Sequence, residues 1–492
     1  MTRMTRRRFL TTSAAAGAAT ILASSKLRAV GANDDLRVAI VGCGGRGGNH
    51  ISAFSKMQGA RIVALCDVDE NHLGKAVAGQ KKNNNSSVKS YQDYRKLLED
   101  KDVDAVVTAT PNHWHSLVTV WGCQAGKDVY VEKPISHDLW EGRKCVEAMN
   151  KYKRVVQHGT QRRSDKLWYD AFDYIRQGNL GAVQWVKGFC YKPRPSIGKV
   201  AAPTPIPEGV NYDLWCGPAP MEPLKRKNLH YDWHWVWPTG NGDIGNQGVH
   251  EMDLCRWFVG NNGLPERVLA IGGRFMVDDD ATTPNTQIVY YDYKPVPFIF
   301  EVRGLPSKKP ADTADGKKWP PMDAFGKIIR VGMWIQCENG YFAAGEGGGW
   351  AYDKSDKKIK QFKQELGAAG HQETFVKAVK SRDPKDNPCN AEIAHYSAAC
   401  CHLGNISYRV GQDHTAGEIT DSIKGNSQMS ESFDRLKDHL AKNGYDANGK
   451  ITLGANLTID QGAERFTGDH AEAANKLLKR DYRSPFEIPE SV

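Results

Sequence analysis

The sequence predicts an α/β protein, in which a doubly wound parallel sheet is followed by a second domain with antiparallel strands. Between residues 36 and 160, short runs rich in β-branched residues alternate with helix-compatible stretches. After about residue 180 the runs mix apolar with polar residues, as half-exposed antiparallel strands do. The length of 492 residues exceeds the roughly 250–300 at which a single core stops growing, so we expect two domains.

Five runs predict the strands of the first domain. They are "LRVAIVG" (36–42), "RIVALCD" (61–67), "VDAVVTAT" (103–110), "DVYVEKP" (128–134) and "VVQHGTQ" (155–161). Helix-compatible stretches such as "LWEGRKCVEAMNKY" separate them, without the close spacing of hairpins. This pattern is typical of βαβ units and therefore of a parallel sheet.

The strands expected in the second domain are "AVQWVKGFCY", "TQIVYYDYK", "FIFEVRG" and "IIRVGMWIQC". Two stretches predict surface loops, one over 193–230 and one in "PSKKPADTADGKKWPPMD" (306–323). Two later stretches predict helices, "GHQETFVKAVKS" (370–381) and "AEIAHYSAACCHLGNISYRVG" (391–411). We therefore expect a leader over 1–32, the parallel domain over 33–157, a substrate domain over 158–410 and a C-terminal extension over 411–492 that wraps the first domain.

The N-terminal stretch "TRRRFLTTSAAAGAA" (5–19) places Arg6 and Arg7 before a mild apolar run. This pattern resembles a twin-arginine (Tat) leader, which is an address read by a translocase and not an anchor. Cleavage is expected after Ala29 or Ala32, with export to the periplasm and no stable membrane span. The alternative is a basic N-terminus without function.

The net charge bears on which partners the protein binds, and the cysteine content bears on the compartment in which it folds. The net charge is +9, but residues 1–29 carry six basic side chains and no acidic one, so the mature chain keeps only +3. So small a charge gives no basic field for nucleic acid, which we exclude as a partner. Eleven scattered cysteines without a C-x-x-C pair are expected to be buried and free, as suits folding in a reducing compartment before export.

The stretch "VGCGGRGG" closes the first predicted strand and opens a helix, with Gly42, Gly44 and Gly47 in G-x-G-x-x-G spacing. In this context the motif predicts a Rossmann dinucleotide site, with the pyrophosphate at the helix N-terminus. A carboxylate at the end of the second strand, Asp67, is expected to bind the adenosine ribose and to favour NAD over NADP. The alternative is a structural turn. The cofactor residues predicted here are Gly42, Cys43, Gly44, Gly45, Arg46, Gly47 and Asp67.

Two further motifs follow parallel strands at the edge where ligands bind. "TPNHWH" (110–115) is expected to cover the nicotinamide side through Thr110, Asn112 and His115. His113 and His115 are two residues apart, which is not a zinc signature, and the sequence predicts no metal site.

"VEKP" (131–134) places Glu132 and Lys133 at the end of another strand, before a proline whose peptide bond can be cis. Both residues are expected to contact the cofactor. A buried lysine there can exchange a proton with a substrate hydroxyl, whereas the alternative is a surface lysine.

Together with "GDIGNQGVHEMD" (242–253), these motifs resemble the Gfo/Idh/MocA oxidoreductase family over about residues 36–410. The resemblance implies a Rossmann domain and an α/β domain with a large, open, mostly antiparallel sheet that often mediates oligomerisation. It also implies that Lys133 and His250 act on the substrate carbon that exchanges hydride. Many relatives have an aspartate where this chain has Asn246, which can orient a group but cannot be a base. Asp243 and Asp253 lie nearby in the sequence and can compensate, and Asp253 is also expected to contact the substrate.

Two stretches supply candidate substrate contacts. "HYDWHWVWPTGNGD" contains Trp233, Trp235 and Trp237, whose alternation indicates either one face of a strand or a platform for a sugar ring. "HGTQRR" (158–163) offers Gln161, Arg162 and Arg163 for hydroxyls or a carboxylate. Either arginine can instead form a salt bridge between domains.

The leading hypothesis is an exported, NAD-dependent oxidoreductase acting on a hydroxyl of a sugar, sugar acid or polyol, with the cofactor held tightly. The alternative is an NAD-assisted glycosidase, and a third class is a non-catalytic binding protein. The expected partners are a carbohydrate, the Tat translocase during export, and further copies of the chain in a homo-oligomer.

Overall fold

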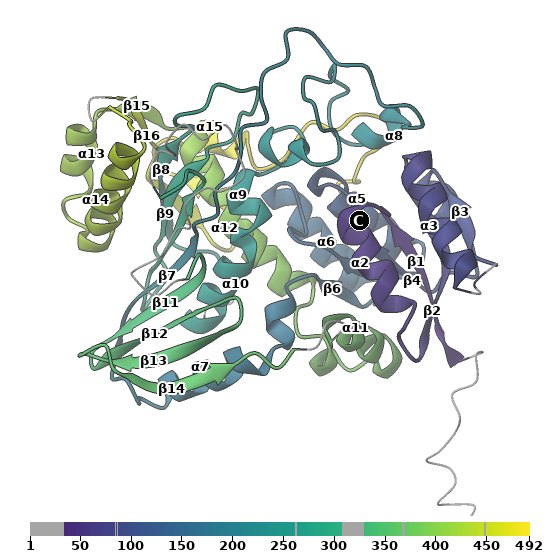
Figure 1. Cartoon of the computed structure of the whole chain (residues 1–492), viewed down its shortest axis with the longest axis horizontal. Coiled ribbons are helices and arrows are strands. Elements are labelled where there is room, and N and C mark those ends of the chain that lie inside the picture. Colours follow the sequence, from purple (N-terminus) through teal and green to yellow (C-terminus); the bar gives the residue numbers. More distant parts are fainter. Residues whose placement is uncertain are drawn as a thin grey trace, which may run out of the picture.

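The computed structural model describes residues 34–83, 85, 87–260, 263–307, 329–366, 370–446 and 449–492. The expected leader over 1–32 and most of the predicted loop over 306–323 lie outside the described residues. Figure 1 shows the N-terminal domain, in purple and blue, beside a larger part built around a broad sheet in teal and green.

Six parallel strands form the sheet of the first domain, in the order β3-β2-β1-β4-β5-β6. They are β1 (Leu36–Val41), β2 (Ala60–Cys66), β3 (Lys89–Tyr91), β4 (Ala105–Thr108), β5 (Asp128–Val131) and β6 (Val156–His158). The predicted parallel sheet is confirmed, and β3 is a short addition at its edge. Because the strand order reverses between β1 and β4, their carboxyl ends open onto a ligand crevice.

The connections between these strands contain α2 (Gly45–Phe54), α3 (Glu70–Lys82), α4 (Tyr94–Leu98), α5 (Asn112–Gln124) and α6 (Leu139–Tyr152). Aspartates at the starts of three of them accept backbone N–H groups, namely Asp69 for α3, Asp93 for α4 and Asp138 for α6. The strand side chains are buried on both faces, which explains their continuous apolar runs.

The second sheet has twelve strands and is mostly antiparallel, with β7 and β10 paired in parallel. Its longest path runs β14-β13-β12-β11-β7-β10-β9-β8-β16-β15, and β17 pairs with β8 and β18. The strands are β7 (Val183–Cys190), β8 (Arg267–Gly273), β9 (Thr286–Tyr291), β10 (Phe298–Arg303), β11 (Val331–Cys337), β12 (Gly340–Gly345), β13 (Gly348–Asp353), β14 (Lys358–Lys363), β15 (Gln412–His414), β16 (Ile451–Leu453), β17 (Leu457–Asp460) and β18 (Arg465–Thr467).

The helices of the larger part fall into three groups. The first group packs on the two sheets and contains η2 (Gln161–Ser164), α7 (Lys166–Arg176), α9 (Gly242–Asn246), α10 (Gly248–Val259), α11 (Gly370–Ser381), η4 (Pro384–Asp386) and α12 (Ala391–Arg409). The long segment after β7 contains α8 (Tyr212–Cys216) and η3 (Asp232–Trp235). The C-terminal region adds α13 (Ala416–Ile423), α14 (Ser427–Lys442) and α15 (Ala471–Asn475).

The two domains share parts of the chain. Phe375 and Val379 of α11 pack in the same core cluster as Val38 of β1, so a late helix completes the first domain. The C-terminal region extends the second sheet through β15 to β18 and then returns to the first domain, where Phe486 and Ile488 join its core. In Figure 1 this last stretch is the yellow chain that ends beside α5.

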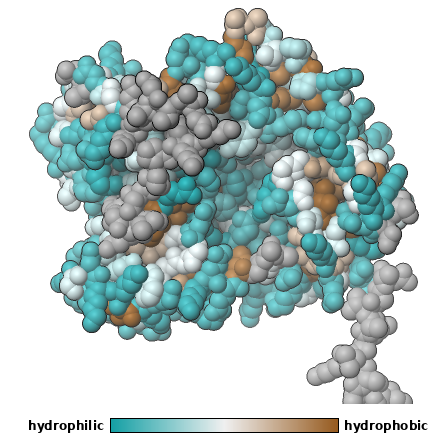
Figure 2. Space-filling model, viewed as in Figure 1, coloured by the Kyte–Doolittle hydropathy of each residue, from teal (hydrophilic) through white to brown (hydrophobic). Residues whose placement is uncertain are grey.

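The cysteines are buried and free, as the sequence predicts, and the face drawn in Figure 2 is mostly polar. All eleven cysteines lie within the described ranges and are free and buried. The face drawn in Figure 2 is mostly hydrophilic, with hydrophobic residues in small separate patches. Among the described residues, no helix combines the length and the apolar character needed to cross a membrane.

Candidate functional site

A cavity of about 530 Å³ lies at the carboxyl ends of β1, β2, β4 and β5. Its other walls come from the segment around η3, from the end of α9 and from the start of α10. The volume falls in the usual range for a small-molecule or cofactor site. The site therefore combines the crevice of the first sheet with a wall supplied by the second domain.

The glycine motif forms the part of the wall where α2 begins. Gly42 has φ +82°, and a Cβ added there would meet the Ala109 carbonyl at 2.9 Å. A Cβ at Gly47 would lie 1.7 Å from the Gly42 carbonyl oxygen, so the helix can approach the loop only with glycine there. Among the described residues no side chain caps the start of α2, which leaves its first N–H groups for an anion. Cys43 and Gly47 support this turn, while Gly44, Gly45 and Arg46 line the cavity.

Asp67 stands directly after β2, at the cavity wall. Its Oδ2 accepts the Cys43 N–H at 2.6 Å and its Oδ1 accepts the Asp69 N–H at 2.9 Å, so the carboxylate is fixed against the glycine loop. Burial raises the pKa of Asp67, and the two amide donors oppose that rise. With free helix N–H groups and this carboxylate on one wall, the residues present fit a dinucleotide.

The turn after β4 is held by hydrogen bonds within the protein. The ring nitrogens of His115 lie 2.6 Å from the Pro134 carbonyl and 2.7 Å from the Thr110 carbonyl. Asn112 donates to the Asn241 side chain at 3.0 Å. Burial lowers the pKa of His115, whereas its contacts with the two carbonyl groups act to raise it. Thr110, Asn112 and His115 all line the cavity, and His115 ties the turns after β4 and β5 together.

The turn after β5 presents Glu132 and Lys133, and the Lys133–Pro134 peptide bond is cis. Glu132 accepts a hydrogen bond from the Arg46 guanidinium at 2.7 Å and lies 3.0 Å from His50. These two partners hold the pKa of the buried Glu132 carboxyl well below its ordinary value. The Lys133 Nζ donates to the Asn246 backbone carbonyl at 2.5 Å. Burial lowers the pKa of Lys133. A buried lysine with a lowered pKa is suited to proton transfer.

Behind Asn246 lies an ion pair that sequence reasoning missed. The Asn246 amide donates to Asp243 at 3.2 Å, and Asp243 accepts two hydrogen bonds from Arg194 at 2.6 and 3.0 Å. Arg194 belongs to the predicted loop over 193–230, where the sequence carries no signal for a buried partner. The pair fixes the start of α9 and thereby the carbonyl that receives Lys133.

His250 lies in the first turn of α10 and lines the cavity beside Lys133 and Asn246. Its Nδ1 is buried and has no hydrogen-bond partner among the described residues. Burial and the nearby charges of Lys133 and Arg162 lower its pKa well below the ordinary value, so the imidazole is neutral. Lys133 therefore meets Asn246 and His250, from a distant part of the sequence, at one point of the wall.

The candidate substrate residues divide into two groups. Gln161 and Trp233 line the cavity. Arg163 and Asp253 instead form a buried ion pair, with Arg163 Nε 2.8 Å from Asp253 Oδ2. Arg162 pairs with Glu251 at 2.8 Å. Neither arginine is among the residues that line the cavity, and nor is Asp253, which corrects their predicted role in direct substrate contact. The arginines form salt bridges, but both bridges lie within the predicted second domain and do not join the two domains.

The tryptophan-rich stretch forms a 3-10 helix. The interpretation of its alternating tryptophans as one face of a strand is therefore wrong. Trp233 stacks on His234 with ring centroids 3.6 Å apart, and both line the cavity. Trp235 is buried, with the Arg194 guanidinium 5.4 Å from its ring centroid. Of the three tryptophans considered as a platform, only Trp233 lines the cavity.

Models of one protein family match both domains. Residues 36–160 match the oxidoreductase family with an NAD-binding Rossmann fold, and residues 180–299 match the C-terminal α/β domain of the same family. The two matches lie in the expected order and cover the glycine loop, Lys133 and His250.

Among curated proteins, an inositol 2-dehydrogenase of Salmonella paratyphi B is 34% identical over 181 residues. The match covers 36% of this chain and 52% of that protein, so the chain spans about half the length of the relative. A glycosyl hydrolase family 109 protein of Shewanella sp. (strain ANA-3) is 32% identical over 204 residues, covering 36% of this chain and 44% of that protein.

Solved structures share the fold at low sequence identity. The WlbA dehydrogenase from Bordetella pertussis, in complex with NADH and UDP-GlcNAcA, has a TM-score of 0.54 at 18% identity, covering 75% of this chain and 95% of that one. An oxidoreductase from Agrobacterium radiobacter, in complex with NAD+, L-tartaric acid and magnesium, has a TM-score of 0.53 at 15% identity, covering 76% and 96%. Both domains therefore match the Gfo/Idh/MocA oxidoreductase family, with residues 36–160 matching its NAD-binding Rossmann domain.

Proposed function

We propose that this protein oxidises a hydroxyl group of a sugar, sugar acid or polyol, with NAD as the hydride acceptor. The observation that carries the proposal is that Lys133 and His250 line the same cavity as the glycine loop and Asp67. Bound NAD supplies a hydride acceptor there, held by the first N–H groups of α2 and by Asp67. The protein's own task is then to place the hydroxyl and remove its proton.

Lys133 is the proposed proton acceptor. Its neutral form, favoured by burial, takes the hydroxyl proton as the C–H hydride leaves. Asn246 and the Arg194–Asp243 pair behind it hold the amine in position. His250 remains neutral and orients the hydroxyl, and Gln161 and Trp233 contact the rest of the substrate.

A second function, NAD-assisted glycoside hydrolysis, is supported by the similarity to glycosyl hydrolase family 109 proteins. Oxidation of a ring hydroxyl to a ketone acidifies the neighbouring C–H. Loss of that proton expels the glycosidic oxygen as an alcohol, water adds across the new C=C bond, and reduction of the ketone restores the hydroxyl. The net reaction is hydrolysis without a change in NAD, and the same Lys133 serves both functions.

The leader motif supports a proposal about location. A Tat route carries folded proteins, so we propose that the chain is exported with NAD already bound and that the cofactor is retained through many turnovers. The open sheet of the second domain supports a homo-oligomer. Localisation of the full-length chain against an Arg6→Lys, Arg7→Lys variant tests the export route, because the Tat translocase reads the two arginines.

Mass spectrometry of molecules released by denaturing the purified protein is the decisive first measurement. Near-stoichiometric NAD or NADH supports retention, and assays without added cofactor then separate the two functions. Accumulation of NADH with a polyol or free sugar indicates oxidation, whereas release of a monosaccharide from a glycoside without net NADH indicates hydrolysis. If the protein neither contains NAD nor binds it in a direct titration, both proposals fail.

A further inference from the structure

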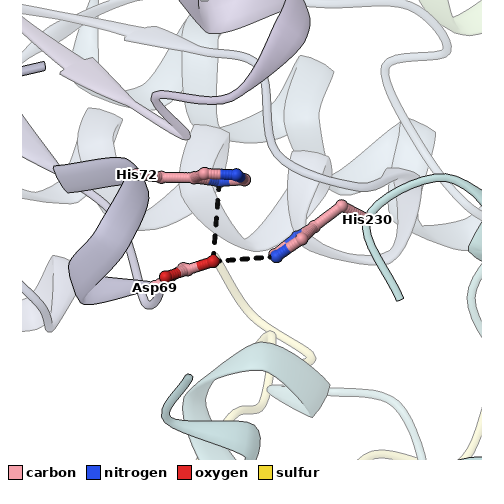
Figure 3. A group of neighbouring side chains, drawn as sticks. All are labelled: Asp69, His72 and His230. Carbon is pink, nitrogen blue, oxygen red and sulfur yellow. Dashed lines mark hydrogen bonds and ion pairs between the residues drawn. The ribbon is translucent and has the colours of Figure 1, made fainter. Parts of the chain in front are cut away.

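Three side chains from two separate parts of the chain meet at the Asp67 end of the cavity. Asp69 caps α3, His72 lies in the first turn of α3, and His230 stands just before η3 (Figure 3). His230 Nε2 lies 2.9 Å from Asp69 Oδ2, and His72 Nδ1 lies 3.9 Å from the same oxygen. One nitrogen or oxygen from each residue lies within 4.8 Å of the other two.

The atoms are spaced as a metal ion requires. Zinc bonds of about 2.0–2.1 Å in a tetrahedron set the ligand atoms about 3.3–3.4 Å apart. The two distances to Asp69 Oδ2, 2.9 and 3.9 Å, lie on either side of that value. Two imidazoles and one carboxylate are a ligand set that zinc and its neighbours in the first transition row accept. The two histidines are partly exposed, so solvent can supply the remaining ligand.

The carboxylate is already oriented for this role. Asp69 Oδ1 accepts the Asn71 N–H at 2.8 Å as the cap of α3, which leaves Oδ2 facing the histidines. Such outer contacts fix the geometry of metal ligands. Asp67 Oδ2 also lies 3.9 Å from His72, but it is bound to the Cys43 amide.

We propose that Asp69, His72 and His230 bind one divalent transition-metal ion of the zinc class, with water completing the coordination. The sequence predicts no such site, because Asp69 and His230 are 161 residues apart. The ion would join the NAD-binding domain to the segment that carries η3. That segment already touches the domain near the same point, where Glu70 N donates to the Gly209 carbonyl at 3.0 Å and Asn211 N donates to the Val68 carbonyl at 2.9 Å.

The site has a consequence for cofactor release. His72 and His230 both line the cavity at the end where Asp67 stands. A metal ion that ties their two segments together should slow the escape of bound dinucleotide. This consequence rests on NAD binding in the cavity, whereas metal binding at the three residues does not.

The test uses the full chain freed of metal with a chelator and then titrated with Zn²⁺ by calorimetry and with Co²⁺ by visible absorption. We expect one ion per chain and a cobalt d–d band without thiolate-to-metal absorption in the near ultraviolet. His230→Ala should weaken binding at least about tenfold, since even outer-shell changes cost 10–100-fold. Asp69→Asn should do the same while keeping the cap of α3, because asparagine is also a good N-cap.

A matched control is His470→Asn, which removes an exposed histidine elsewhere, at a position with φ +62° that asparagine tolerates. It should bind metal as the unmodified chain does. The proposal is overturned if the unmodified chain takes up no Zn²⁺ in the micromolar range, if His230→Ala and Asp69→Asn bind as tightly as the control, or if thiolate absorption appears. Thermal unfolding of the metal-free proteins shows whether each variant is folded. Equal NAD release with and without Zn²⁺ overturns only the consequence for the cofactor.

Discussion

The two ends of the cavity are built differently. At the Lys133 end, the polar groups are bound in a chain, from Lys133 to Asn246, from Asn246 to Asp243, and from Asp243 to Arg194. At the Asp67 end, the wall is completed by His72 and His230, which are partly exposed and come from segments that meet through a few backbone contacts. One end is fixed by buried ion pairs, and the other is a junction between two segments.

This difference matches what each end is proposed to do. Proton transfer requires donors and acceptors held in place before the substrate arrives, because reorganising them during the reaction raises the barrier. Admission and release of a dinucleotide instead require a wall that can open. We therefore expect changes at the Lys133 end to affect turnover with bound cofactor unchanged, and changes at the Asp67 end to affect the cofactor first.

The largest effect is expected from Lys133→Met, which keeps the side-chain length and removes the amine. General acid–base groups contribute about 10²–10⁴-fold, so turnover should fall by about 10³-fold. NAD released on denaturation should stay at the unmodified level. Lys385→Met, at an exposed position far from the cavity, is the control and should retain activity. Loss of NAD together with activity would contradict the separation of the two ends.

Gly47→Ala should have the next largest effect, because it should weaken binding of the NAD pyrophosphate by the glycine loop, which lies between the two ends. A Cβ there would lie 1.7 Å from the Gly42 carbonyl oxygen, so the loop must shift. Loss of two hydrogen bonds to a charged phosphate costs about 3 kcal/mol, or about a hundredfold in NAD affinity. The measurement is a titration of cofactor-free protein with NAD.

Gly48→Ala is a control in the same helix. A Cβ there meets no atom within 4 Å among the described residues, so binding should be unchanged. Stability should be equal or slightly higher, since alanine favours a helix more than glycine does. Equal NAD affinity in both variants would show that close packing of α2 on the loop does not control the cofactor.

Much of the fold could be predicted because its signals are local. The parallel strands are buried on both faces, and runs such as "AIVG" record that burial directly. The short β3 was missed because its three residues, Lys89 to Tyr91, are polar and lie at the edge of the sheet. The helix over 370–381 was predicted, but its packing in the core of the first domain was not, since an apolar helix face does not reveal which core it will meet.

The candidate site likewise contains residues that local sequence signals predict and residues that they do not. Gly42, Asp67 and Lys133 end predicted strands, and the carboxyl ends of parallel strands share one edge. Arg194 and His230 could not be found, because they lie in a stretch without regular structure and act through partners distant in sequence. Arg163 and Asp253 were expected to contact substrate, since a motif gives position but not the partner that a buried charge will take.

The pH dependence of turnover tests whether Lys133 is the proton acceptor. Burial lowers the pKa of Lys133, and the neutral amine is the proton acceptor, so oxidation should accelerate with rising pH and level off below the ordinary pKa of 10.5. Below that point the rate should change about tenfold per pH unit, as for one ionising group. His250 should not change the rate near neutral pH, because its own pKa lies well below the ordinary value. A rate that is independent of pH between 6 and the plateau, with chemistry limiting, would exclude Lys133 as the base.

The smallest effect is expected from Asp67→Asn, which tests how far the Asp67 end discriminates between cofactors. The amide keeps one oxygen that can accept the Cys43 N–H, but it loses the negative charge and the acceptor for the Asp69 N–H. Loss of about 1 kcal/mol at the ribose should weaken NAD binding about fivefold. NADP should bind better than before, because the charge that repels its 2′-phosphate is gone. Titration with both cofactors measures the ratio, with Asp421→Asn as an exposed control. An unchanged ratio would mean that the backbone around Asp67, and not its charge, selects the cofactor.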